Sequence, residues 1–320
     1  MFRKISLILL LVASLFAEDV VEVYRKSGPQ AAINTIEKEL ASKDYWINYL
    51  ANKDVTLGFY EENKSILICD KAKPDLTLYK YSHGKLTKVE TIKAIVGGGK
   101  GDKLKEGDYK TPTGSYDLLD KLGKLNQFYG PFAYNTDYPN LYDTVNGKGG
   151  HGIWLHGVPL DGNRTNNSKG CVVIDNDSLK KLDTVINLKK TVVIIDDQAI
   201  QKTTKEEIAT IISAMYQWKD AWMRNDTKKY MSFYDERFRR FDGMDLKKYT
   251  EYKARVFGKN EQKSIYFREF EITPNPTSVG ERIFKIKFYE DYIAPSYKFN
   301  GYKDLFVKVS NGKMTIMAER

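Results

Sequence analysis

The pattern of apolar and polar residues changes character along the chain and predicts three structural regions. Residues 18–53 carry apolar positions at helical spacing, with Pro29 placed to begin a helix. Residues 54–197 mostly alternate apolar and polar positions, as half-buried strands do. Residues 203–320 begin with a long amphipathic helix and continue as strands. The pattern therefore predicts a helical segment too short for its own core, a mainly β domain and an α+β domain.

The middle region is predicted to be a mostly β domain with one or two helices. A helix is expected over 175–188, with Asp177 near its N-cap and Leu179, Leu182 and Ile186 facing inward. Strands are predicted at 55–60, 65–69, 76–81, 91–96 and 191–196.

The C-terminal region opens on a capping-box pattern, with Thr204 followed by Glu207. Apolar residues then recur on one face of a long helix through Trp222, and the aromatic residues at 230–238 are expected on further helix. This order of helices before a curled antiparallel sheet resembles the NTF2-like fold, which implies a pocket of unknown ligand. Strands are predicted at 265–272, 282–289 and 304–309, with Asn300-Gly301 and Asn311-Gly312 as hairpin turns.

The N-terminus has the pattern of a secretory signal peptide. Arg3 and Lys4 precede an apolar run over 5–16, which ends at Ala17 and is too short to span a bilayer. We expect cleavage after Ala17, so that residues 1–17 are removed and the mature protein is exported and soluble. An uncleaved anchor is the alternative.

Charge and cysteine content narrow the classes of function. The formal net charge of +9 suits an anionic polymer such as a cell wall, or an anionic lipid face. No nucleic-acid partner is expected, because the chain has a signal peptide and no nucleic-acid-binding motif. No metal or other cofactor is expected, since no His, Cys and Asp cluster has ligand spacing. Cys69 lies in a predicted buried strand and Cys171 is expected to be a free thiol, so the two cysteines do not form a disulfide framework.

Two short segments hold the candidate chemistry. The first, residues 153–157, places His156 at the end of an apolar run and before a glycine. The second, residues 168–174, places Cys171 between a glycine and an apolar run. A thiol beside an imidazole is a nucleophile with its base, because thiolate is the attacking species. A single cysteine or histidine in an apolar run more often has a structural role than a catalytic one. The polar loop over 161–168 changes this expectation, because it would let Cys171 fold back beside His156.

These two segments resemble the catalytic signature of the L,D-transpeptidase (YkuD) family, in which a His-Gly pair, a loop and a Ser-x-Gly-Cys stretch follow one another. Residues 106–116 resemble the Lys-Thr-Pro-x-Gly stretch of that family. Residues 138–143, with the glycines that follow, resemble a hydrolytic branch of it. The resemblance spans residues 64–196 and implies that the middle region is a YkuD-type catalytic domain.

The resemblance also implies a role for each residue of the site. Cys171 would attack a peptide carbonyl of a peptidoglycan stem peptide, His156 would take the thiol proton, and the Gly157 carbonyl would orient the imidazole. Backbone N–H groups at Gly170 and Cys171 would stabilise the oxyanion. Substrate contacts are expected from Ser168, Lys169, Arg164, Trp154 and Tyr142.

The chain departs from the common transpeptidase pattern at two positions. Lys169 stands where the family often has His, which leaves His156 as the local base. Val173 stands where the family often has Arg, a carboxylate-binding cation. That binding role is then open to Arg164 or Lys169.

The order of helical segment, YkuD-type domain and NTF2-like domain resembles the L,D-carboxypeptidases that shape helical Gram-negative cells. This resemblance favours hydrolysis of tetrapeptide stems to tripeptides in the periplasm, with a transpeptidase that forms 3-3 cross-links or attaches proteins to the wall as the alternative. A wall-binding scaffold without catalysis is the alternative from another class, against which an intact Cys171 and His156 argue. The segment over 18–53 must pack on another domain or on a second copy, so a homodimer through it is one of two arrangements left open.

Overall fold

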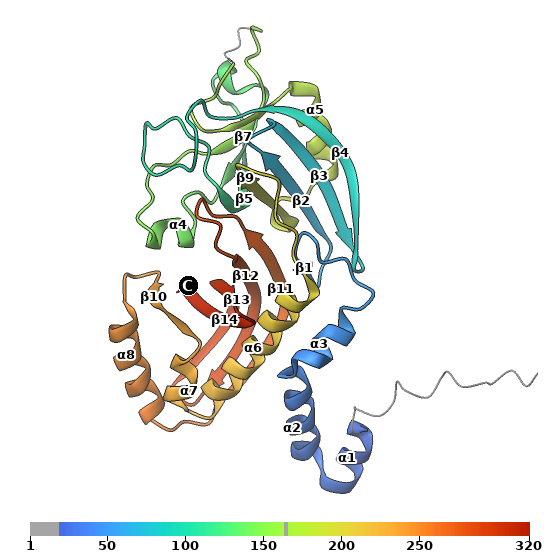
Figure 1. Cartoon of the computed structure of the whole chain (residues 1–320), viewed down its shortest axis with the longest axis vertical. Helices are drawn as coiled ribbons and strands as arrows, with labels where there is room; N and C mark the ends of the chain where they lie inside the picture. The colour runs from blue at the N-terminus through green and yellow to red at the C-terminus, as the bar shows by residue number, and fades with distance from the viewer. Residues whose placement is uncertain (1–18, 163–165) are drawn as a thin grey trace, which may run out of the picture.

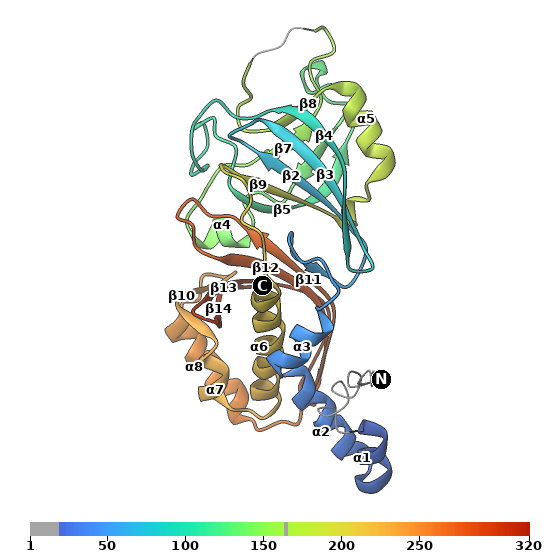
Figure 2. The same ribbon diagram turned by 45° about the vertical axis from the view of Figure 1, so that its right-hand side comes forward.

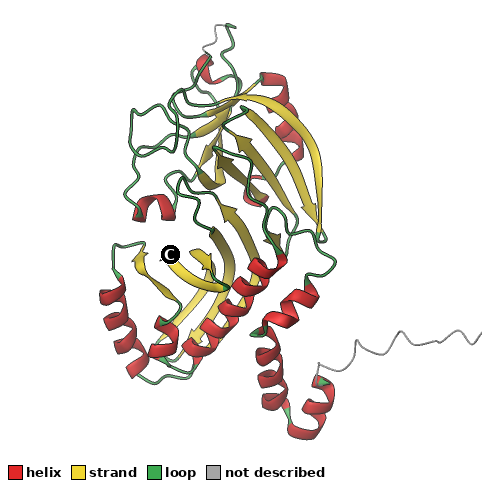
Figure 3. Ribbon diagram, viewed as in Figure 1, coloured by secondary structure: helices red, strands yellow, loops and turns green. Residues whose placement is uncertain are grey.

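The computed structural model describes residues 19–162 and 166–320, and these form two β-rich units stacked along the long axis of the molecule (Figures 1 and 2). A run of N-terminal helices lies beside the lower unit. Figure 3 shows that strands dominate both units and that helices gather on the lower one. The expected fold class, a mainly β unit joined to an N-terminal helical segment and a C-terminal α+β unit, is confirmed. The segment 1–17, predicted to be a signal peptide, lies outside the described residues.

The upper unit is a closed barrel with the strand order β2-β3-β4-β8-β7-β6-β5-β9. Short helices connect its strands. The strands are β2 (Lys64–Asp70), β3 (Asp75–Ser82), β4 (Lys85–Ile95), β5 (Gly114–Leu122), β6 (Ala133–Thr136), β7 (Trp154–His156), β8 (Val172–Ile174) and β9 (Thr191–Asp196). The helices are η1 (Gln127–Tyr129), α4 (Leu141–Val145), α5 (Asn176–Val185) and η2 (Leu188–Lys190).

Strand alternation sends one set of apolar side chains into the barrel. Leu67 and Cys69 on β2 share this core with Val193 and Ile195 on β9. Burial raises the pKa of the Cys69 thiol to about 12, and the prediction that Cys69 fills the core is confirmed. The helix expected at 175–188 is α5, and its N-cap is Asp175, whose side chain accepts the Ser178 N–H.

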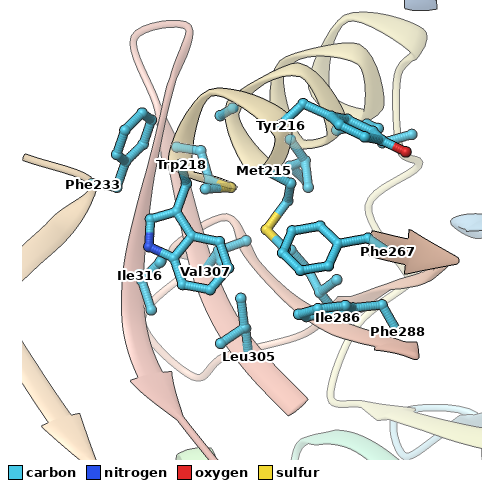
Figure 4. Packing of buried hydrophobic residues seen from close by; sticks show 14 of the residues in the cluster. Met215, Tyr216, Trp218, Phe233, Phe267, Ile286, Phe288, Leu305, Val307 and Ile316 are labelled. Atoms are coloured by element: carbon cyan, nitrogen blue, oxygen red, sulfur yellow. The ribbon is translucent and has the colours of Figure 1, made fainter. Parts of the chain in front are cut away.

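The lower unit is a curved sheet with the strand order β1-β11-β12-β13-β14-β10, covered by helices on its concave face. Thr204 and Glu207 form the predicted capping box at the start of its long helix. In Figure 4, Met215 and Trp218 of that helix point onto apolar side chains of the sheet. The elements are β1 (Phe59–Tyr60), α6 (Lys205–Met223), α7 (Thr227–Met231), β10 (Tyr234–Arg240), α8 (Leu246–Gly258), β11 (Ser264–Asn275), β12 (Ile283–Ala294), β13 (Tyr297–Ser310) and β14 (Lys313–Glu319).

Two expectations for this unit were wrong. Tyr234 and Phe238 lie on strand β10 and not on a helix, because a spacing of four places two side chains on one face in either structure. Asn300-Gly301 lies inside β13, where Gly301 pairs with Glu290 of β12. The antiparallel pairing continues to the ends of both strands and moves the turn to residues 295–296. Asn311-Gly312 does form the predicted turn before β14.

The N-terminal helices are α1 (Val20–Ser27), α2 (Pro29–Leu40) and α3 (Lys43–Tyr49), and α2 begins at Pro29 as predicted. Trp46 of α3 is buried in the C-terminal core, with its ring stacked 5.9 Å from that of Tyr216. Of the strand expected at 55–60, only Phe59–Tyr60 is formed, and it pairs with β11 of the lower sheet. No helix within the described residues is long and apolar enough to cross a membrane.

Charged and aromatic contacts join the two units. Lys285 of β12 places its ammonium 3.1 Å from a carboxylate oxygen of Asp117 and 3.0 Å from one of Asp137, both in the barrel. Tyr142 of α4 packs against Phe306 of β13, with ring centroids 5.5 Å apart. The barrel is therefore seated on the lower sheet through buried contacts of both kinds.

Candidate active site

The two predicted catalytic segments meet because β7 and β8 are neighbouring parallel strands. The register pairs His156 of β7 with Val173 of β8, and Leu155 with Val172. Alternation then places Trp154, His156 and Val173 on one face, and Cys171, just before β8, lies on the same side. All four line one cleft of about 1060 Å³.

Cys171 is a partly exposed free thiol that lines this cleft. Its Sγ lies 3.4 Å from the carbonyl oxygen of Gly152, to which the thiol donates a hydrogen bond. Burial raises the pKa of Cys171, while the Trp154 N–H and the positive charge of Lys103 act in the opposite direction. The resting thiol is therefore protonated and needs a base before it can attack.

His156 lines the same cleft and is the candidate for that base. Its Nδ1 lies 2.7 Å from the Gly157 carbonyl oxygen, and because a carbonyl only accepts, Nδ1 carries the proton and Nε2 is an acceptor. Burial lowers the pKa of His156, although the bond to Gly157 opposes this effect, so the imidazole is neutral at pH 7. The ring of Tyr129 on η1 packs edge-on against the imidazole at 5.1 Å.

Gly157 leaves no space for a side chain. A Cβ at this position would lie 2.1 Å from Oδ1 of Asn176 and 3.1 Å from Cδ of Pro131. The Gly157 N–H donates to the Tyr129 carbonyl at 3.2 Å, which ties the His-Gly pair to η1. The glycine is required so that its backbone can approach these groups and hold the imidazole.

Ser168 organises the turn that precedes Cys171. Its hydroxyl donates to the Cys171 carbonyl at 2.6 Å and accepts the Gly170 N–H at 3.1 Å. The Gly170 N–H, an expected oxyanion donor, is thus engaged by a side chain here and must leave it to bind an oxyanion. Gly170 itself has φ of +128° and packs against the Lys110 carbonyl, which explains the glycine.

Of the other residues predicted to contact the substrate, two line the cleft and one lies away from it. Trp154 lines the cleft beside Tyr129, with ring centroids 4.9 Å apart, and Lys169 is exposed on its wall. Tyr142 does not face the cleft, because the capping box of α4 turns it toward the C-terminal sheet, where it is buried. Arg164 lies outside the described residues.

Two residues of the cleft region were not predicted. Lys103 is buried on the cleft wall, and its ammonium lies 2.8 Å from Oδ1 of Asp108. Although burial favours the protonated acid, Lys103 and three backbone N–H groups hold the pKa of Asp108 well below its usual range. Asp108 belongs to the 106–116 motif, so its position was a usable signal. No sequence motif pointed to Lys103, because its burial arises only when the surrounding loop is folded.

The other histidines lie apart from this pair, and the described residues contain no group of three or more His, Cys, Asp or Glu side chains that could hold a metal ion. His151 is exposed at the cleft mouth, with Nε2 3.6 Å from Glu106. His83 contacts Ser82 on the β3–β4 turn. His156 is thus the histidine on the face of the strand pair that also carries Cys171, and both line the cleft.

A barrel whose parallel strand pair presents a cysteine and a His-Gly pair to one cleft defines the class of the protein. The family model for the L,D-transpeptidase (YkuD) catalytic domain matches residues 64–195, and the model for the Cds6 C-terminal NTF2-like domain matches residues 210–320.

Solved structures show the whole architecture in relatives. The chain is similar to Pgp2, a helical cell shape determining protein of Campylobacter jejuni, with 40% identity and a TM-score of 0.83 over 88% of this chain and 99% of that one. It is also similar to Bd1075 of Bdellovibrio bacteriovorus, with 27% identity and a TM-score of 0.65 over 83% and 96% of the two chains. A search of curated proteins found no match. The chain belongs to the family of Pgp2, and it joins a YkuD catalytic domain to an NTF2-like domain.

Proposed function

We propose that the protein is a cysteine-dependent L,D-carboxypeptidase of the periplasm that removes the terminal D-alanine from tetrapeptide stems of peptidoglycan. The observation that carries this proposal is the placement of Cys171 and His156 on one face of a parallel strand pair, in an open cleft. The name of Pgp2 as a cell shape determinant supports a role in the cell wall.

The chemistry follows from the protonation states of the two side chains. His156 Nε2 takes the proton of the Cys171 thiol as Sγ attacks the carbonyl carbon of the scissile bond. The tetrahedral intermediate collapses, the C–N bond breaks, and His156 returns the proton to the departing amine. This leaves a thioester on Cys171 and free D-alanine.

The second half of the reaction releases the tripeptide. Water gives a proton to His156 as its oxygen attacks the thioester carbonyl, and the C–S bond then breaks. The thiolate recovers the proton and the resting pair is restored. An amine in place of water gives a transpeptidase by the same intermediate, so the two outcomes differ only in the acceptor.

Hydrolysis is favoured over transfer by two features of the chain. The order of its domains resembles that of the L,D-carboxypeptidases that shape helical cells, and the chain matches the helical cell shape determining protein Pgp2 over nearly the whole length of that protein. Val173, where transpeptidases of the family often carry Arg, is buried on the cleft face opposite His156. The cleft therefore lacks a cation at that position.

The test supplies purified disaccharide-tetrapeptide with an excess of a D-amino acid or of a second stem as acceptor. Accumulation of tripeptide and D-alanine, resolved by mass, supports the carboxypeptidase. Exchanged stems or 3-3 dimers as the main product would instead support the transpeptidase. If neither product forms and Cys171 resists alkylation, the protein is a scaffold. Cys171→Ala is the matched control, because it keeps the fold and removes the nucleophile.

A further inference from the structure

Lys103 is a buried lysine in the wall of the cleft that contains Cys171. Its side chain is 4% exposed, and its ammonium donates to Asp108 Oδ1 at 2.8 Å and to the carbonyl of Lys105 at 3.0 Å. An ammonium has three N–H bonds, and among the described residues two of them have protein acceptors at this site. Because Lys103 lines the cleft, the third N–H can be donated to an acceptor that binds there.

The positive charge of Lys103 is only partly offset by its carboxylate partner. Asp108 also accepts the backbone N–H groups of Leu104, Lys105 and Lys110, at 2.8, 3.2 and 3.2 Å. These three donors share the negative charge, so the field of the lysine extends into the cleft. Lys103 and Cys171 line the same cleft, and although burial raises the pKa of Cys171, the charge of Lys103 acts to lower it.

The other groups on the cleft wall are less suited to bind an anion. Lys169 is exposed, and a flexible exposed ammonium is screened by solvent and must be ordered on binding. Glu106 and His151 face each other at 3.6 Å on the exposed rim. Val173 has no charge. Lys103 is the cation that the surrounding loop already holds in one place.

We propose that Lys103 binds the free C-terminal carboxylate of the leaving amino acid and thereby restricts cleavage to the last residue of a peptide stem. The inference rests on the proposed function and names its specificity-determining residue. The carboxylate of the leaving residue lies two bonds beyond the scissile nitrogen. Lys103 lines the same cleft as the attacking sulfur and is held in place by its own loop, so its ammonium is placed to meet that carboxylate.

The experiment compares two substrates in the full-length protein. One is the disaccharide-tetrapeptide that ends in D-alanine, and the other is the same compound with a terminal D-alaninamide. We expect the wild type to prefer the acid by roughly 30-fold in kcat/KM, as one charge-assisted hydrogen bond would give. Lys103→Met should bring the two substrates to near parity, mainly by slowing cleavage of the acid.

Controls separate carboxylate binding from a structural or electrostatic role. A loss of structure, or of the effect on the Cys171 thiol, lowers the rates for acid and amide by the same factor and leaves their ratio unchanged. Lys105→Met removes an equal charge from an exposed position in the same loop and should keep the preference. If Lys103→Met does not fold, Lys103→Gln retains a donor for Asp108 and decides the question.

The outcomes distinguish this inference from the function on which it rests. A wild type that releases no D-alanine from the acid overturns both. A wild type that cleaves acid and amide equally, or a folded Lys103 variant that keeps the preference, overturns the assignment of Lys103 and leaves the carboxypeptidase intact. Loss of the preference in Lys169→Met but not in Lys103→Met would transfer the role to Lys169.

Discussion

At the residue scale, the two cysteines show that burial and neighbours decide what a thiol can do. Cys69 is fully enclosed by the barrel core, which raises its pKa to about 12 and makes it inert. Cys171 is partly exposed in a cleft, where burial also raises its pKa but the Trp154 N–H and the charge of Lys103 act against that effect. The same side chain is therefore a core residue at one position and a candidate nucleophile at the other.

Replacement of each cysteine by alanine should separate these roles. Cys171→Ala should lower turnover of tetrapeptide by at least about 1000-fold while the protein stays folded, because no other described group can form the thioester. Cys69→Ala should keep the activity and cost roughly 1 kcal/mol of unfolding free energy. Product analysis and urea denaturation of both variants test this. A folded, inactive Cys69→Ala beside an active Cys171→Ala would reverse the assignment.

The pH dependence of Cys171 alkylation should report His156. Burial lowers the pKa of His156 below its ordinary value of 6.5, so the imidazole stays neutral and basic as the pH falls to that value. We therefore expect the acid limb of the wild-type profile to lie below pH 6.5.

Without the imidazole, the pKa of the Cys171 thiol alone determines how much thiolate is present at each pH. Burial raises the pKa of Cys171 above 9.0, so alkylation of His156→Ala should rise only in the alkaline range and be slower by about 100-fold at pH 7. His151→Ala, at an exposed position, is the control and should keep the wild-type profile. An unchanged profile in His156→Ala would remove His156 from the mechanism.

At the scale of elements, the segment of β8 and α5 supplies the candidate nucleophile and also packs against the His156-Gly157 pair. Cys171 precedes β8, and Asn176 begins α5 directly after it. The Asn176 side chain fills the space beside Gly157, which directly follows the neighbouring strand β7. The packing of this segment against β7 is therefore what orients the His-Gly pair.

Gly157→Ala tests this packing. The new Cβ would overlap Oδ1 of Asn176, so we expect a loss of about 1–3 kcal/mol in unfolding free energy and a displaced imidazole with reduced kcat. The double variant Gly157→Ala with Asn176→Ala should recover part of both losses, because the overlapping atoms are gone. Asn176→Ala alone is the reference. Full stability and activity in Gly157→Ala would show that the contact is unimportant.

At the scale of the whole molecule, the barrel and the C-terminal sheet share a buried ionic contact. Burial opposes the charge of Lys285, but the carboxylates of Asp117 and Asp137 outweigh it and raise the pKa of Lys285. Burial in turn raises the pKa of Asp137 to about 6, although Lys285 acts to lower it. Both units are needed to complete this cluster, so each contributes to the stability of the other.

Removal of the shared ammonium should weaken the whole molecule. Lys285→Met leaves the partly buried Asp117 and Asp137 together without their main counter-charge, and we expect a loss of about 3 kcal/mol in the free energy of unfolding. Urea denaturation followed by fluorescence measures it. Addition of Asp137→Asn should restore part of the loss, whereas Lys298→Met at an exposed site should have little effect.

The helices α1 and α2 expose apolar side chains, and a homodimer through this segment stays a proposal. Val21, Ile33 and Ile36 are 69%, 49% and 45% exposed, whereas α3 is already packed on the C-terminal unit. Sedimentation at several concentrations should show a dimer that charged substitutions at these three residues convert to monomer, with kcat unchanged. A wild-type monomer at all concentrations would contradict the proposal.

Residues close together in the sequence determined where several helices and turns of this protein begin. The capping box at Thr204, the start of α2 at Pro29 and the turn at Asn311-Gly312 depend on residues close in sequence, so they could be predicted. The placement of His156 and Cys171 in one cleft was also predictable, because the motif carries both residues and the loop between them limits how far they can separate.

Tertiary structure decided the features that depend on contacts between distant segments. The pairing of β1 with β11, the placement of Tyr142 against Phe306 and the continuation of β13 through Asn300-Gly301 all follow from long-range register. The burial of Lys103 beside the cleft is of the same kind. A segment with a given local pattern could pack against several other segments of the chain. The fold of the whole chain decides among them, because it favours the packing that buries the most apolar surface and leaves no buried polar group without a hydrogen bond.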